Sequence, residues 1–146
     1  MVRFLVVACI AVASLAGCGG SGEEKKAKVV IDDQLRYYVQ AQEALARDNF
    51  DEAGRSLLLM WEHTQEPLNK KVYQAAKAAD IADMRQIFVD ISAAMDVKAL
   101  PAGYSLAYCP MANENKGAHW VQKEGEITNP YYGSSMLRCG TLKESM

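Results

Sequence analysis

Two clusters that each combine a cysteine with a methionine occur in the last third of this 146-residue chain. Cys109 and Met111 lie two positions apart in "YCPM", and Met136 and Cys139 lie three apart in "MLRC". Thiolate and thioether are soft ligands that select Cu(I) among the available metal ions, whereas thioether rarely binds zinc. These four side chains are therefore candidate ligands of a Cu(I) site, to which His119 could add an imidazole.

The two cysteines also allow a structural interpretation. In an oxidising compartment, Cys109 and Cys139 can simply form a disulfide. Closing a loop of that length would stabilise the fold by roughly 3–4 kcal/mol in the chain-entropy treatment. The bond would leave Met111, Met136 and His119 as the remaining ligand candidates. The residue types alone leave the metal site and the disulfide both open.

The N-terminal segment indicates the compartment. Arg3 precedes an apolar run and then small residues, which is the layout of a secretory signal, and the run is shorter than the about 20 residues of a transmembrane helix. The stretch Leu15-Ala16-Gly17-Cys18 resembles the bacterial lipoprotein signal, which implies cleavage before Cys18 and lipid on its sulfur and amine. We therefore expect a signal peptide at 1–17 and a lipidated cysteine with a flexible tether at 18–29.

The expected location is the cell envelope, with the domain facing the periplasm. Gly19 follows the lipidated cysteine, in place of the aspartate that marks inner-membrane retention in some bacteria. The outer membrane is therefore favoured over the inner one.

Residues 30–146 are expected to form one domain that begins with four helices over 30–100. Asn49 and Asp80 predict the N-caps of the second and fourth helices, and Pro67 suits the first turn of the third. Apolar residues recur at helical spacing in all four segments. The expected fold is all-α, an up-and-down four-helix bundle. Its core should include Leu35, Leu57, Met60, Phe88 and Ile91, and Trp61 is also expected inside.

The remaining segment, 101–146, predicts an irregular tail rich in cysteine, methionine and aromatic residues that packs on the bundle. Tyr104, Leu106 and Tyr108 alternate with small or polar residues, which suits a short extended segment. The Asn129-Pro130 step and Gly133 favour a chain reversal, and a short helical turn is expected around Met136. We expect this reversal to bring the two cysteine–methionine clusters together.

The tail also resembles a known signature. "YCPM", a following Trp120 and "NPYYGSSMLRCG" look like the motif of a bacterial domain family of unassigned function. That domain stands alone in periplasmic proteins and lipoproteins, and it also occurs attached to the periplasmic adaptors of copper/silver-type heavy-metal efflux pumps. The resemblance runs from about Leu35 to the end and implies a role in metal handling. The motif residues that we expect to pack the tail are Trp120, Asn129, Pro130, Tyr131, Tyr132 and Gly133.

Composition narrows the function classes further. The chain carries 16 Lys and Arg against 18 Asp and Glu, with no basic face, so nucleic acid is not an expected partner. No Ser/His/Asp set, phosphate-binding loop or shared carboxylate pair occurs, so we do not expect an enzyme. Two functions remain. One is a lipid-anchored Cu(I)-binding module that buffers the ion or assists a heavy-metal efflux system. The other is a disulfide-stapled helical domain that binds a partner protein and no metal.

Overall fold

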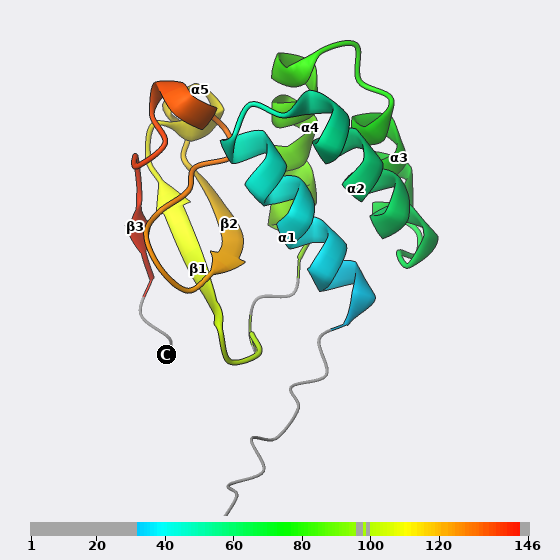
Figure 1. Cartoon of the computed structure of the whole chain (residues 1–146), viewed down its shortest axis with the longest axis horizontal. Coiled ribbons are helices and arrows are strands. Elements are labelled where there is room, and N and C mark those ends of the chain that lie inside the picture. The colour runs from blue at the N-terminus through cyan, green and yellow to red at the C-terminus, as the bar shows by residue number, and fades with distance from the viewer. Residues whose placement is uncertain (1–31, 96–97, 99, 144–146) are drawn as a thin grey trace, which may run out of the picture.

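The computed structural model describes residues 32–95, 98 and 100–143, and these form a mixed α/β domain (Figure 1). The expected signal peptide, Cys18 and tether lie outside the described residues. No described helix is both long and apolar enough to span a bilayer. The elements in chain order are α1 (Asp33–Ala46), α2 (Phe50–Glu62), α3 (Leu68–Ala76), α4 (Ile81–Ala94), β1 (Tyr104–Cys109), α5 (Ala112–Asn115), β2 (Ala118–Lys123), the 3-10 turn η1 (Gly133–Ser135) and β3 (Thr141–Leu142).

The helices begin at the predicted capping residues. The Asn49 side chain accepts a hydrogen bond from the Glu52 backbone N–H, and its amide donates to the Glu52 carboxylate. The reciprocal backbone bond of a capping box is not made, because the Asn49 N–H donates to the Ala44 carbonyl. The Asp80 carboxylate accepts from the backbone N–H groups of Ala82 and Asp83. Pro67 immediately precedes α3. Side-chain caps therefore define the starts of α2 and α4, whereas Pro67 makes no capping hydrogen bond at the start of α3.

The helical core is largely the predicted one. Each of the four helices packs against the next, and Leu35, Leu57, Met60, Phe88 and Ile91 are all buried. The expectation for Trp61 is wrong, because its side chain is 41% exposed on α2 beside Tyr73 of α3.

The all-α expectation is also wrong, because the tail forms a three-stranded antiparallel sheet in the order β2-β1-β3. Tyr104 pairs with Lys123 and Cys109 with Ala118 at the two ends of the β1–β2 ladder, and β3 pairs with β1 through Ala107. An isolated extended segment would leave its backbone N–H and C=O groups without partners. The segment predicted around Tyr104–Tyr108 therefore acquires a strand on each side.

The sheet lies against the helices through β2, which packs on both α1 and α4 (Figure 1). The outer edge of β2 is covered by tyrosine hydroxyls. The Val121 N–H donates to the Tyr38 hydroxyl of α1 at 3.3 Å, and the Tyr131 hydroxyl donates to the His119 carbonyl at 2.5 Å. Tyr38 is fully buried, which raises its pKa, and it also bonds Ser92 of α4. These bonds give partners to backbone groups on the outer edge of β2 that would otherwise be unpaired.

Candidate functional site

Three sulfur atoms meet where β1 ends and the tail returns. Cys109 Sγ lies 3.0 Å from Cys139 Sγ, and Cys139 Sγ lies 3.9 Å from Met111 Sδ. Cys109 is fully buried, Cys139 is partly exposed and Met111 is 46% exposed. We call these three residues the sulfur cluster. It extends from the edge of the core to the surface.

The buried Asn129 holds the part of the tail that carries Cys139. Its side-chain amide donates to the Cys139 carbonyl at 2.7 Å, and its backbone N–H donates to the Leu137 carbonyl at 2.9 Å. The Cys139 N–H in turn donates to the Met136 carbonyl at 3.0 Å. Asn129 was expected to be a packing residue, and its bonds fix the backbone that carries Cys139.

Met111 is positioned by a left-handed turn. Asn113, Glu114 and Asn115 in α5 all have positive φ. Asparagine adopts this left-handed backbone readily, so the cost of roughly 1–2 kcal/mol falls chiefly on Glu114. Such a conformation persists only where its surroundings enforce it. One restraint is the Tyr132 hydroxyl, which donates to the Met111 carbonyl at 2.6 Å. The motif residue Tyr132 therefore supports the backbone of a cluster residue.

The other two predicted ligands lie apart from the cluster. His119 pairs with Tyr108 while its neighbour Ala118 pairs with Cys109. Because successive strand residues point to opposite faces, the His119 imidazole faces away from the Cys109 thiol. Met136 is half-buried and contacts Cys139 through its carbonyl. Within the described parts of the chain, no sulfur contact joins Met136 to either cysteine.

The remaining aromatic motif residues pack the sheet against the helices. The Trp120 ring is fully buried, donates through Nε1 to Gln122, and meets the Tyr131 ring edge-on at 5.7 Å. Tyr131 also contacts Phe88 of α4. Trp120 and Tyr131 therefore connect β2 to the helical core.

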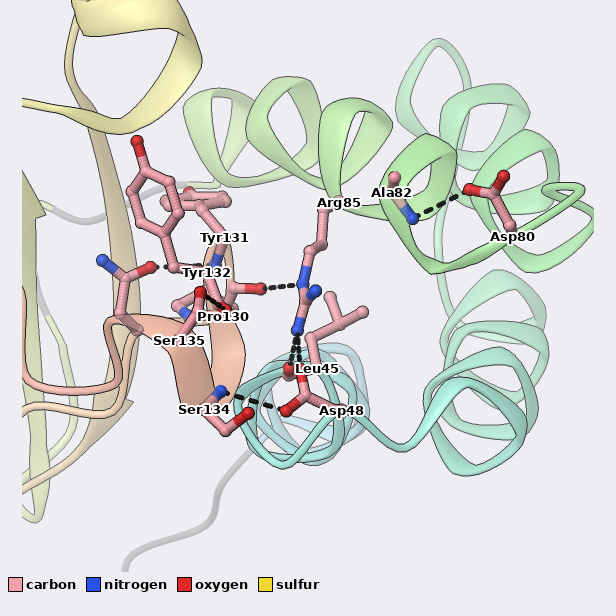
Figure 2. A network of polar contacts seen from close by, with 11 residues as sticks. Leu45, Asp48, Asp80, Ala82, Arg85, Pro130, Tyr131, Tyr132, Ser134 and Ser135 are labelled. Atoms are coloured by element: carbon pink, nitrogen blue, oxygen red, sulfur yellow. Dashed lines mark hydrogen bonds and ion pairs between the residues drawn. The ribbon is translucent and has the colours of Figure 1, made fainter.

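A polar network that the sequence did not indicate fastens the tail to the helices (Figure 2). Arg85 of α4 donates to Asp48 Oδ1 at 2.5 Å, to the Leu45 carbonyl at 2.7 Å and to the Pro130 carbonyl at 2.9 Å. The Ser134 N–H donates to Asp48 Oδ2 at 3.0 Å. We call Asp48, Arg85 and Ser134 the tail latch. Hydrogen bonds from Ser134 and then Arg85 lower the pKa of Asp48 to about 2.

The latch gave almost no sequence signal. Asp48 and Ser134 lie 86 positions apart, and each resembles an ordinary loop residue. Gly133 was expected to permit a reversal, and its φ of +57° does place it in the left-handed region. Together with the Asn129-Pro130 step, that glycine was the local indication that the chain turns tightly here.

The chemistry of the sulfur cluster fits a soft metal ion. The described residues contain no group of three or more His, Cys, Asp or Glu side chains that could hold a metal. The Met111 thioether, 3.9 Å from Cys139 Sγ, is the candidate third ligand beside the two thiols. Three sulfur ligands in a plane around an ion, with bonds of about 2.3 Å, lie roughly 4.0 Å apart. A disulfide requires about 2.05 Å. The observed 3.0 Å lies between these values, so small side-chain movements reach either state.

Comparisons with models of protein families, with curated proteins and with solved structures find no match to this chain. The resemblance of the tail to the efflux-associated domain therefore stays a prediction. The functional argument depends on what the sulfur cluster and its surroundings can do chemically.

Proposed function

We propose that this protein binds Cu(I) through Cys109, Cys139 and Met111, and acts as a copper buffer or as an accessory to metal efflux. The observation that carries the proposal is the convergence of two thiols and one thioether within hydrogen-bonding range of sulfur. Soft sulfur ligands favour Cu(I) over the harder divalent ions.

The three ligands would have different roles. Cys109 is held at the end of β1 and is fully buried, so it would form the fixed inner ligand. Cys139 is held by the Asn129 bond and would close the site from the tail. Met111 is 46% exposed, so it would be the ligand that a copper donor or acceptor meets first. This order from core to surface suits an ion that is passed on.

The proposal includes the expected membrane anchor. Lipid on Cys18 would hold the domain on the membrane. The residue that follows, Gly19, favours the outer membrane over the inner one. The Gly- and charge-rich tether would let the domain stand off that surface. The support for this part comes from the N-terminal sequence alone.

Anaerobic Cu(I) titration of the reduced protein against a competing chelator tests the metal site. Met111→Leu should lower Cu(I) affinity about tenfold or more because it removes one ligand of the cluster. Met136→Leu is the matched control, since it makes the same substitution at a methionine outside the cluster, and it should leave the affinity unchanged. Both replacements conserve volume and should change stability by less than about 1.5 kcal/mol. Equal affinities for Met111→Leu and the parent protein would refute the proposed site.

A second candidate function is favoured by the same 3.0 Å sulfur separation. If Cys109 and Cys139 stay permanently oxidised, the disulfide would staple the tail to β1, and the domain would serve to bind a partner protein. Thiol titration of protein purified from the periplasm, without and with reductant, separates the two functions. Free thiols before reduction favour the copper site, and thiols that appear only after reduction favour the staple.

A further inference from the structure

The two cysteines of the sulfur cluster differ in their access to solvent. Cys109 belongs to the hydrophobic core and has no exposed surface, whereas Cys139 is partly exposed beside the exposed Met111. Thiol–disulfide exchange requires the attacking sulfur to reach its target directly. A reagent from solution can therefore reach Cys139 and cannot reach Cys109 while the domain stays folded.

We propose that Cys109 and Cys139 form a reversible dithiol–disulfide couple that exchanges with low-molecular-weight thiols and disulfides at Cys139 only, with Cys109 as the resolving thiol. The couple shares its residues with the proposed copper site, but its chemistry needs no metal. It would also control the copper site, because oxidation removes both thiolate ligands.

The oxidation proceeds in two exchanges. The Cys139 thiolate attacks one sulfur of a small disulfide, a bond from Cys139 to that sulfur forms, and the other sulfur leaves as a thiolate that takes up a proton. The Cys109 thiolate then attacks Cys139 Sγ, the protein disulfide forms, and the second small thiolate leaves and is protonated. The protein loses two electrons and two protons, and the small disulfide becomes two thiols. Reduction runs the same steps backwards.

The structure favours the second step strongly. The resolving sulfur of Cys109 already lies 3.0 Å from Cys139 Sγ. Both backbones are fixed, Cys109 by its pairing with Ala118 and Cys139 by the bond from Asn129. The sulfurs need to approach by only about 1 Å to reach the disulfide length. An adduct at Cys139 should therefore resolve quickly when Cys109 is present.

Oxidised glutathione is the probe, applied to the full-length protein in the presence of a metal chelator. Intact-mass measurement and peptide mapping then follow the modification at the two cysteines. Cys109→Ala should accumulate one glutathione on Cys139, because the resolving thiol is missing. In Cys139→Ala, glutathione should add to Cys109 at least tenfold more slowly than it adds to Cys139 in Cys109→Ala, because Cys109 has no exposed surface. The parent protein should form the internal disulfide without accumulating an adduct. Cys109→Ser serves in place of Cys109→Ala if the alanine variant does not fold.

Denatured Cys109→Ala and Cys139→Ala provide the control, because their single remaining cluster thiols should then react at similar rates. Modification of Cys109 in folded Cys139→Ala as fast as that of Cys139 in folded Cys109→Ala would overturn the proposal. So would a stable glutathione adduct in the parent protein. Because a chelator is present, these results are independent of copper. Exchange at Cys139 without Cu(I) affinity would refute the proposed function and leave this inference standing.

Discussion

Gly133→Ala should destabilise the protein by breaking the tail latch. Gly133 begins η1 with φ of +57°, and a Cβ at this position would overlap Asp48 Oδ1 and Arg85 Nη2. These are the two atoms that join in the latch ion pair. The substitution therefore adds steric displacement of the latch to the ordinary cost of a left-handed alanine.

The two contributions can be sized from the structure. Left-handed backbone costs an alanine roughly 1–2 kcal/mol. The Asp48–Arg85 pair is partly exposed, with side chains 39% and 15% accessible, so its loss costs up to about 1 kcal/mol. Losing the bond from the Ser134 N–H to Asp48 adds about 1 kcal/mol. The expected total is about 3 kcal/mol.

Urea unfolding at neutral pH and at acidic pH measures both the size and the cause. Gly103→Ala is the control, because Gly103 also has a positive φ, of +91°, but has open space around its Cβ position. In Gly103→Ala, the unfolding free energy should still fall at acidic pH by the amount that Asp48 contributes. In Gly133→Ala, that contribution to the fall should be missing. A loss below about 1 kcal/mol, or an unchanged acid sensitivity in Gly133→Ala, would show that the latch does not hold the tail.

Two further predictions concern Asp48 and Cys18. The pKa of Asp48 is lowered from 3.8 to about 2 in the folded protein, so its stabilising contribution is complete above about pH 4 and is lost as the pH falls towards 2. Asp48→Asn should flatten the dependence of unfolding free energy on pH in that window, and an unchanged slope in acid titration would contradict the assignment. Cys18→Ser should release the protein from membranes or block its processing, and an unmodified N-terminus in the intact mass of membrane-bound parent protein would disprove lipidation.

Local physical chemistry accounts for what the sequence by itself determined. The caps at Asn49 and Asp80 use side chains within three residues of the groups they bond, so they are visible in the sequence. The buried positions of Phe88 and Ile91 follow from helical periodicity. The approach of Cys109 and Cys139 was also expected, because a reversal between them was signalled by Asn129-Pro130 and Gly133.

The sheet was missed because its pairing is not local. In β2, Trp120, Val121 and Gln122 are all buried in succession, so the strand lacks the alternation that would have marked it. The buried Gln122 is satisfied by the Thr128 N–H and the Glu126 carbonyl, partners that only the folded tail supplies.

Tertiary structure alone decided the composition of the candidate site. Met111 and Met136 are equivalent by residue type and by nearness to a cysteine, yet only Met111 Sδ reaches Cys139 Sγ. The choice depends on the left-handed turn at Asn113 and on the Tyr132 hydroxyl that bonds the Met111 carbonyl from 21 positions away. Residue type and spacing along the chain indicate which side chains are candidate ligands. Long-range hydrogen bonds, which hold a locally unfavourable backbone conformation, decide which of these ligands lie close together. No short stretch of sequence encodes such bonds.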